Sequence, residues 1–169
     1  MKRIDLAQTG DIANLIHRIG KNWMLITAGT PTRLNTMTAS WGGIGVLWHR
    51  PMVNIFIRPE RYTYEFIEAH EHFSLAFFDP AKHRETLTFC GKHSGRNVDK
   101  VSACAFTVAE GEKGGVFFEE ADLVLLCQKR YRTPLDLAQM MGFDTDQYYG
   151  DHGNPHVMYM GEIVEAYTP

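Results

Sequence analysis

Two short basic segments of the sequence have the composition of an anion-binding site. In residues 58–63 (RPERYT), a strand-like stretch with two arginines leads into a short helix, and Thr63 is the expected N-cap. Backbone amides at a helix N-terminus lack acceptors, and with guanidinium groups they bind phosphate. In residues 92–96 (KHSGR), Ser94 and Gly95 precede another short helix, where glycine permits close approach of a ligand. Each segment alone is also typical of a solvated surface, but together they favour a phosphorylated ligand.

A third segment, residues 35–43 (NTMTASWGG), combines small hydroxylated side chains with one large ring, Trp41. On a strand, small side chains leave space at the sheet face and offer hydroxyls and unhindered amides to a flat polar ring. Trp41 could then form one wall of the pocket. A weakly packed edge strand would have the same composition, so the segment alone leaves both interpretations open.

The histidines and cysteines do not form a recognisable metal or redox motif. His152 and His156 are four residues apart, but a glycine and a proline between them are incompatible with a regular helix. Cys90, Cys104 and Cys127 are widely spaced and odd in number, which favours reduced thiols in a cytosolic protein over a redox pair. Motifs of serine hydrolases, zinc proteases and P-loop NTPases do not occur either. We therefore expect no metal site.

Length and composition place the chain among ordinary globular proteins. Its 169 residues are 44% hydrophobic and 22% charged, which predicts a single domain spanning residues 1–169. The net charge of −3 argues against binding to nucleic acid or to an anionic membrane. No apolar run approaches the ~20 residues of a membrane helix, and no secretory signal is visible at the start. A cytoplasmic location is expected.

The elements that would position these segments are mostly strands. Alternating and β-rich runs bounded by turn residues predict seven of them. They are residues 24–28, 36–41, 52–58, 73–78, 106–109, 123–131 and 157–164. The glycine-rich residues 111–115 are expected to form a hairpin loop.

Helices are predicted to be few and short. The expected helices are residues 63–70, residues 80–89 after the Asp79 N-cap, residues 97–103 after a Ser94 cap, and a segment from Thr133-Pro134 to Gly142. Many strands with short helical insertions favour an antiparallel barrel of the mainly β class. A doubly wound parallel sheet would need longer helices and a GxGxxG turn, which does not occur.

Four segments, in this order, resemble the flavin reductase-like FMN-binding proteins, and among them the flavoredoxin-like group. They are NTMTASWGGIGVLWHRP, IFIRPERYTYEFIE, CGKHSGRNVDKV and HVMYMGEIVEAY, and the resemblance covers about residues 20–167. The resemblance implies an antiparallel Greek-key split β-barrel, normally a homodimer, with FMN as cofactor. It implies that the flavin ring lies along Met37, Thr38, Ala39, Ser40 and Trp41, the phosphate and ribityl chain near Arg58, Tyr62 and Thr63, and a second anion-binding segment at Ser94, Gly95 and Lys100.

The resemblance also implies a catalytic histidine near the nicotinamide of an NAD(P)H donor. In many relatives a Gly-Asp-His triplet precedes the last strand. Here His152 keeps the triplet, whereas His156 has the expected spacing of five residues before Gly161. We assign the role to His156, because the register of the strand should fix its position.

The function implied is that of an FMN-dependent NAD(P)H:flavin oxidoreductase that passes electrons to a free flavin or to an acceptor protein. The alternatives are a non-catalytic FMN-binding or storage protein on the same barrel, and a barrel that binds haem or a pyridoxal-type phosphate. An oligonucleotide-binding barrel is disfavoured by the net charge and by the lack of aromatic–basic interleaving. The apolar residues 135–143 (LDLAQMMGF) could contribute to a dimer contact or pack on their own barrel.

Overall fold

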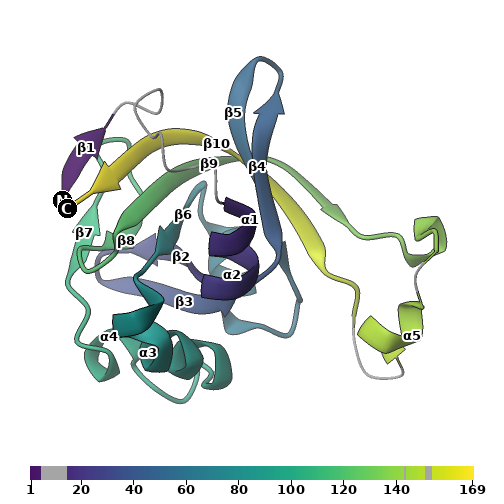
Figure 1. Cartoon of the computed structure of the whole chain (residues 1–169), viewed down its shortest axis with the longest axis horizontal. Coiled ribbons are helices and arrows are strands. Elements are labelled where there is room, and N and C mark those ends of the chain that lie inside the picture. Colours follow the sequence, from purple (N-terminus) through teal and green to yellow (C-terminus); the bar gives the residue numbers. More distant parts are fainter. Residues whose placement is uncertain (5–14, 143, 151–153) are drawn as a thin grey trace.

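The chain folds mainly as strands, with short helices in the connections (Figure 1). The structure, a computed structural model, describes residues 1–4, 15–142, 144–150 and 154–169. The strands are β1 (Lys2–Ile4), β2 (Met24–Thr30), β3 (Arg33–Ala39), β4 (Gly42–Leu47), β5 (Arg50–Ile57), β6 (His72–Phe77), β7 (Val108–Glu110), β8 (Val116–Phe118), β9 (Leu123–Pro134) and β10 (Val157–Thr168). The helical segments are α1 (Leu15–His17), the π-helical η3 (Arg18–Asn22), α2 (Tyr62–Ala69), α3 (Pro80–Lys92), α4 (Lys100–Ala103), the 3₁₀ segment η4 (Leu137–Gln139) and α5 (Thr145–Tyr148).

One antiparallel sheet follows the order β3-β2-β6-β9-β10-β5-β4, with β1 paired to the far end of β10. Strands β3 and β4 lie at opposite ends of this order, yet only Ser40 and Trp41 separate them in the sequence. The sheet must therefore curl until its two edges meet at these residues. We call this meeting place, residues 37–42, the seam. The predicted mainly β, antiparallel split barrel is confirmed.

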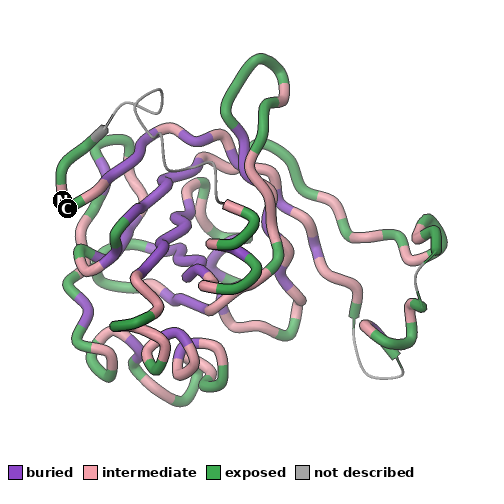
Figure 2. Tube along the Cα trace, viewed as in Figure 1, coloured by how far each residue is buried: buried purple, intermediate pink, exposed green. Residues whose placement is uncertain are grey.

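Alternation along the strands fills the barrel with apolar side chains (Figure 2). On β10, for example, Val157, Tyr159 and Ile163 are buried, and Tyr159 packs in one cluster with Phe73 and Ile55. A second apolar cluster lies under α3, whose Leu87 and Cys90 face the sheet, and it includes Phe118. Burying side chains of this size stabilises the fold by about 1.5–3 kcal/mol each.

All seven predicted strands are present, with shifted ends. Strand β3 begins earlier than expected, at Arg33, while β9 and β10 extend to Pro134 and Thr168. The predicted strand 106–109 is instead Val108–Glu110, and it forms a hairpin with β8 around the predicted loop, closed by a bond from Gly111 N to Gly115 O. Strands β1, β4 and β8 were not predicted. Half of the residues of β4 (GGIGVL) are glycines, which are uncommon in strands, so its sequence does not predict a strand.

Two of the helix predictions are correct, the predicted helix 97–103 is present only as the shorter α4, and the fourth prediction is wrong. Helix α3 begins as expected, with Asp79 Oδ1 accepting from Ala81 N. The helix predicted from Thr133 to Gly142 is wrong, because Thr133 and Pro134 pair with β10 and only the short η4 follows. The Ser94 cap is also wrong, because Asp99 caps α4. Helix α2 matches the predicted 63–70 closely, but it starts at Tyr62 rather than after a Thr63 cap.

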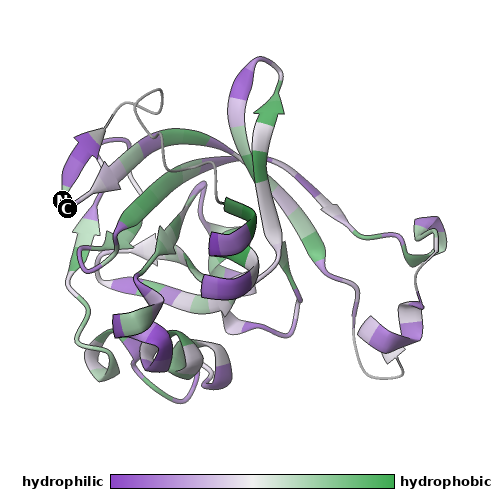
Figure 3. Cartoon of the chain, viewed as in Figure 1, coloured by the Kyte–Doolittle hydropathy of each residue, from purple (hydrophilic) through white to green (hydrophobic). Residues whose placement is uncertain are grey.

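Two segments project from the barrel: the β4–β5 hairpin and the arm formed by residues 135–142 and 144–150 (Figure 1). The hairpin turn consists of Trp48 and His49, both with positive φ, as in the tight turns that match strand twist. Val46 and Trp48 near its tip are exposed, as is Met141 on the arm. Figure 3 shows the hydrophobic end of β4 at this tip. No described helix is long and apolar enough to cross a membrane.

Candidate functional site

The seam exposes a strand edge beside a cavity. Strand β3 pairs with β2 on one side, and no described strand pairs with its other edge. Its C-terminal end and the residues that follow line a cavity of about 280 Å³. The lining residues are Met37, Thr38, Ala39, Ser40, Trp41, Phe56, Arg58, Arg61 and His156. The structure therefore brings the predicted residues 37–41, Arg58 and His156 together in one place, which we call the seam cavity.

His156 lies just before β10 and is held on three sides. Its carbonyl accepts from Leu135 N at 2.9 Å, its Nδ1 lies 3.0 Å from the Tyr149 hydroxyl, and its ring centroid lies 4.9 Å from that of Trp41. Burial, reinforced by the nearby charge of Arg58, lowers the pKa of His156 to about 4. The imidazole is thus neutral near pH 7, with one nitrogen donating and the other accepting. His152, the other candidate, lies outside the described residues.

Arg58 is engaged by the projecting arm. Its Nη2 donates to the Tyr148 carbonyl at 2.5 Å, and its guanidinium lies 5.5 Å from the centroid of the Tyr149 ring. A guanidinium carries five N–H donors, so these contacts leave others free to face the seam cavity. The arm therefore reaches back to the seam and orients Arg58 there.

A smaller cavity of about 140 Å³ adjoins the first, and we call it the loop cavity. It is lined by Asn35, Met37, Glu60, Arg61, Tyr62, Thr63, Gly91, Lys92, His93, Ser94, Gly95 and Lys100. All the remaining predicted site residues are in this set. Met37 and Arg61 line both cavities, so the two cavities lie next to each other.

Thr63 lies in the loop cavity but not in the predicted role. It is 1% exposed, and its Oγ1 accepts from Asn35 Nδ2 at 2.7 Å. Helix α2 begins one residue earlier, with Arg61 as its N-cap residue. The prediction of Thr63 as a capping side chain is therefore wrong, because the buried Asn35 amide uses its hydroxyl. Tyr64 N donates to Arg61 O at 2.9 Å, so among the first amides of α2 only those of Tyr62 and Thr63 lack an acceptor within the helix.

Lys100 is buried and points at backbone carbonyls. Its Nζ donates to Thr36 O at 2.7 Å and to Cys90 O at 2.8 Å, which ties β3 to α3. Burial lowers the pKa of Lys100 to about 8, so the side chain remains mostly charged at pH 7. It therefore places positive charge at the floor of the loop cavity while it holds the fold together.

Arg61 is a functional candidate that the sequence analysis did not single out. Its guanidinium donates to Gly91 O at 3.1 Å, and burial lowers its pKa from the ordinary value. It remains charged and borders both cavities. The only sequence signal was its place in the RPER stretch next to Arg58, which does not distinguish one arginine from the other.

Gly95 is needed for packing rather than for an open approach. A Cβ at this position would lie 1.9 Å from Asn35 Oδ1 and 3.2 Å from the Tyr62 ring. Ser94 bonds locally, its Oγ accepting from Arg96 N at 3.2 Å. Because Gly95 has no side chain, the loop can pack directly against Asn35 of β3 and Tyr62 of α2.

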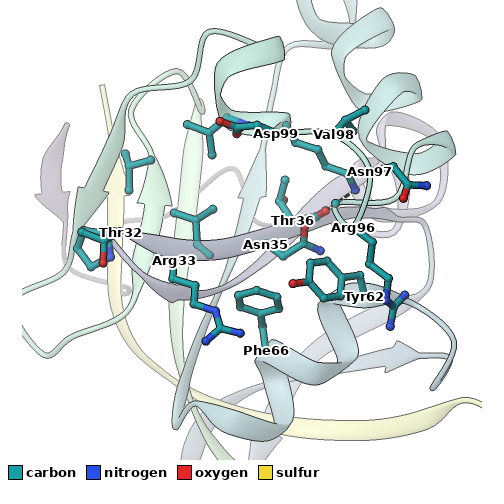
Figure 4. Close-up of a pocket in the computed structure, with 16 residues that line it drawn as sticks. Thr32, Arg33, Asn35, Thr36, Tyr62, Phe66, Arg96, Asn97, Val98 and Asp99 are labelled. Carbon is teal, nitrogen blue, oxygen red and sulfur yellow. Dashed lines mark hydrogen bonds between the residues drawn. The ribbon is translucent and has the colours of Figure 1, made fainter.

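Another cavity, of about 590 Å³, is lined in part by the same loop (Figure 4). It shares Asn35, Tyr62, Gly95 and Lys100 with the loop cavity. Two arginines border it, each over an aromatic ring: the Arg33 guanidinium lies 5.9 Å from the centroid of Phe66, and that of Arg96 lies 4.7 Å from the centroid of Tyr62. Within the described part of the chain, no three His, Cys, Asp or Glu side chains are placed to hold a metal ion.

Comparisons with known proteins agree with this fold. The family model of the flavin reductase like domain matches residues 16–169, so the chain belongs to the flavin reductase-like family. No curated protein matches it.

Several solved structures share the fold. Flavoredoxin from Methanosarcina acetivorans is 24% identical, with a TM-score of 0.69 over 88% of this chain and 68% of that one. The FMN-binding domain of a flavin reductases-like enzyme from Shewanella baltica is 17% identical, with a TM-score of 0.68 over 99% of this chain and 76% of the other. An NADH:FAD oxidoreductase from Streptomyces globisporus is 16% identical, with a TM-score of 0.65 over 100% of this chain and 88% of its own.

Proposed function

We propose that the protein binds FMN across the seam and loop cavities and transfers electrons through it. The observation that carries this proposal is that the two cavities lie side by side, with Met37 and Arg61 lining both. The seam cavity has the free edge of β3 and the ring of Trp41. The loop cavity has the start of α2 and the cationic side chains of Arg61 and Lys100. This pairing fits a ligand with a flat polar ring at one end and a phosphate at the other.

At the seam, the free edge of β3 would hold the ring. Backbone amides of residues 38–41 can donate to the polar edge of an isoalloxazine, and such donors favour negative charge there. Thr38 Oγ1 bonds to the Leu87 carbonyl of α3, which fixes this part of the strand. FMN, when bound, supplies the capacity to accept a hydride and to release electrons singly or in pairs.

In the loop cavity, positive charge and helix amides would hold the phosphate. Arg61 faces both cavities, Lys100 forms part of the floor, and the first amides of α2 lie beside them. A charge-assisted bond from a guanidinium to phosphate is about twice as strong as a neutral one. We assign the main phosphate contact to Arg61, with Arg58 nearer the ring.

The hydride donor that we propose is NAD(P)H, with His156 orienting the nicotinamide. The neutral imidazole is fixed by Tyr149 and packed against Trp41, so it can direct one ring nitrogen at a polar group of the donor. A neutral imidazole adds no positive charge that would repel the nicotinamide cation formed when the donor gives up its hydride. The proposed activity is that of an NAD(P)H:flavin oxidoreductase with a free flavin or an acceptor protein downstream, which is consistent with the names of several structural neighbours.

We also propose that the protein is a homodimer built on its projecting segments. The exposed apolar side chains of the hairpin and the arm, Val46, Trp48 and Met141, lie outside the barrel, where a second copy could cover them. Light scattering coupled to size exclusion tests this proposal, and a monomeric mass at micromolar concentration would contradict it.

Titration of the purified protein with FMN, followed anaerobically by NADH and NADPH in separate cuvettes, tests the proposed function. We expect flavin fluorescence to change on binding and the flavin colour to bleach with at least one nucleotide. Binding without bleaching by either nucleotide would instead support a flavin-storage protein. Absence of FMN binding would overturn the proposal altogether.

A further inference from the structure

Two cysteines outside the proposed chemistry lie side by side. The Sγ atoms of Cys90 and Cys104 are 3.8 Å apart. Cys90 is fully buried on α3, whereas Cys104, at the C-terminal cap of α4, is partly exposed. The third cysteine, Cys127, is buried on β9 and bonds through its Sγ to the Leu125 carbonyl.

One residue holds the backbone of both cysteines in place. Lys100 Nζ donates to the Cys90 carbonyl at 2.8 Å, and the Lys100 carbonyl accepts from Cys104 N at 3.0 Å. The pair is therefore fixed by the same lysine that ties α3 to β3. To form a disulfide bond of ~2.05 Å, the two sulfur atoms must approach each other by less than the width of one atom, through rotation of their side chains.

The environment of each thiol sets the order in which they would react. Burial raises the pKa of Cys90 to about 12 and raises that of Cys104 as well, while the charge of Lys100 acts in the opposite direction on both. Because only Cys104 is in contact with solvent, an oxidant reaches its sulfur first. Cys90 is then the nearest thiol to the oxidised sulfur.

We propose that Cys90 and Cys104 form a reversible intramolecular disulfide on exposure to a hydroperoxide. The Cys104 thiolate attacks one peroxide oxygen, the O–O bond breaks, and a sulfenic acid and hydroxide form. Cys90 sulfur then attacks Cys104 sulfur, the S–O bond breaks, and the released hydroxide leaves as water with the Cys90 proton. With hydrogen peroxide, two thiols are oxidised and one peroxide is reduced to two waters.

The bond would tie the two ends of the segment that lines the loop cavity. Residues 91–103 lie between the cysteines, and Ser94, Gly95 and Lys100 are among them. Oxidation would thus join α3 covalently to α4 next to the proposed phosphate site. The modification itself does not depend on what that site binds.

Peptide mapping can test the proposal directly, because trypsin places each cysteine on its own peptide. Cys90 falls in residues 85–92, Cys104 in residues 101–113 and Cys127 in residues 114–129. After treatment of the folded full chain with hydrogen peroxide and blocking of free thiols, we expect the first two peptides to be linked, with the loss of two hydrogen atoms. Dithiothreitol should separate them, and the third peptide should carry the blocking group.

Two variants serve as controls. Cys104→Ser should abolish the linked species, whereas Cys127→Ala should leave it at the wild-type yield. If either variant fails to fold, the wild-type map still decides, since its three peptides are distinct. Three blocked thiols after peroxide, a link to Cys127, or sulfinic acid on Cys104 without a link would each overturn the proposal.

Discussion

The seam and loop cavities adjoin, but they are built in different ways. At the seam, residues 38–40 are half-buried, Trp41 is 43% exposed, and one edge of β3 pairs with no described strand. In the loop cavity, Asn35, Thr63 and Lys100 are buried and bonded to one another or to nearby carbonyls. The polar side chains of the loop cavity are therefore mostly buried and bonded across the fold, whereas those around the seam cavity are more exposed and each makes at most one side-chain hydrogen bond to a described residue, as Arg58 does to Tyr148 and His156 to Tyr149.

This difference separates two kinds of expected mutational effect. Changes in the loop cavity should lower stability even without ligand, because they strip partners from buried polar atoms. Changes at the seam should leave the fold intact and alter binding or electron transfer. A variant that breaks this division would show that the two cavities are not built as described.

Replacement of Lys100 should have the largest effect. In Lys100→Met the carbonyls of Thr36 and Cys90 lose their donor, so we expect the free energy of unfolding to fall by about 3 kcal/mol. Urea denaturation of the ligand-free protein measures this loss. The matched control is Lys82→Met on the exposed face of α3, which should change stability little. Equal midpoints for the two variants would contradict the structural role of Lys100.

Gly95→Ala should have the next largest effect. The added Cβ would overlap Asn35 Oδ1, which is held in place by Thr63, so we expect a loss of about 2 kcal/mol. Thermal unfolding of the ligand-free protein measures it. Gly45→Ala is the control, because a Cβ there meets nothing within 4 Å. A fully stable Gly95→Ala protein would mean that the loop can move away from β3.

Arg61→Ala tests the residue that lies at the boundary between the two cavities. We expect the Kd for FMN to rise about tenfold, equivalent to ~1.4 kcal/mol, since Arg61 borders both cavities. Arg58→Ala should weaken binding less, because that guanidinium borders only the seam cavity and is held by Tyr148. Fluorescence titration of both variants tests this order. A larger effect at Arg58 would move the phosphate contact to that residue.

The titration of His156 should have no effect on stability at neutral pH, and its contribution should be seen only in the pH dependence of stability. Its pKa is about 4 in the folded protein against an ordinary 6.5, so between these values only the unfolded chain binds the proton. Stability should therefore be fully present above pH 6.5 and fall as the pH drops towards 4. His156→Gln should flatten this part of the curve, while His93→Gln, at an exposed site, should not. Parallel curves for His156→Gln and the wild type would contradict the buried neutral imidazole.

The sequence predicted what depends on local pattern. Alternation identified the strands of the barrel, and the small residues before Trp41 identified the strand at the seam. The resemblance placed His156 by its distance from Gly161, and the structure puts it against Trp41. The edge-strand and pocket interpretations of residues 35–43 both describe β3, which is an edge strand that borders a cavity.

What the sequence could not predict depends on partners distant along the chain. Thr63 is a good capping residue, but the buried amide of Asn35, 28 positions earlier, uses its hydroxyl. Thr133-Pro134 is typical of a helix start, yet pairing with β10 keeps it extended. Arg61 could be told from Arg58 only by its distant partner, the carbonyl of Gly91 at the end of α3. Localisation and the single-domain organisation stay predictions.

The position of β10 in the middle of the sheet has a consequence for how the protein is made. Strand β5 can form its hairpin with β4 as soon as both leave the ribosome, but its other neighbour comes a hundred positions later, with Ile57 beside Val157. Until then, the nascent chain exposes the open flanks of β5 and β9, a situation that slows folding and invites aggregation. Production in cells should therefore benefit from chaperones that shield these flanks.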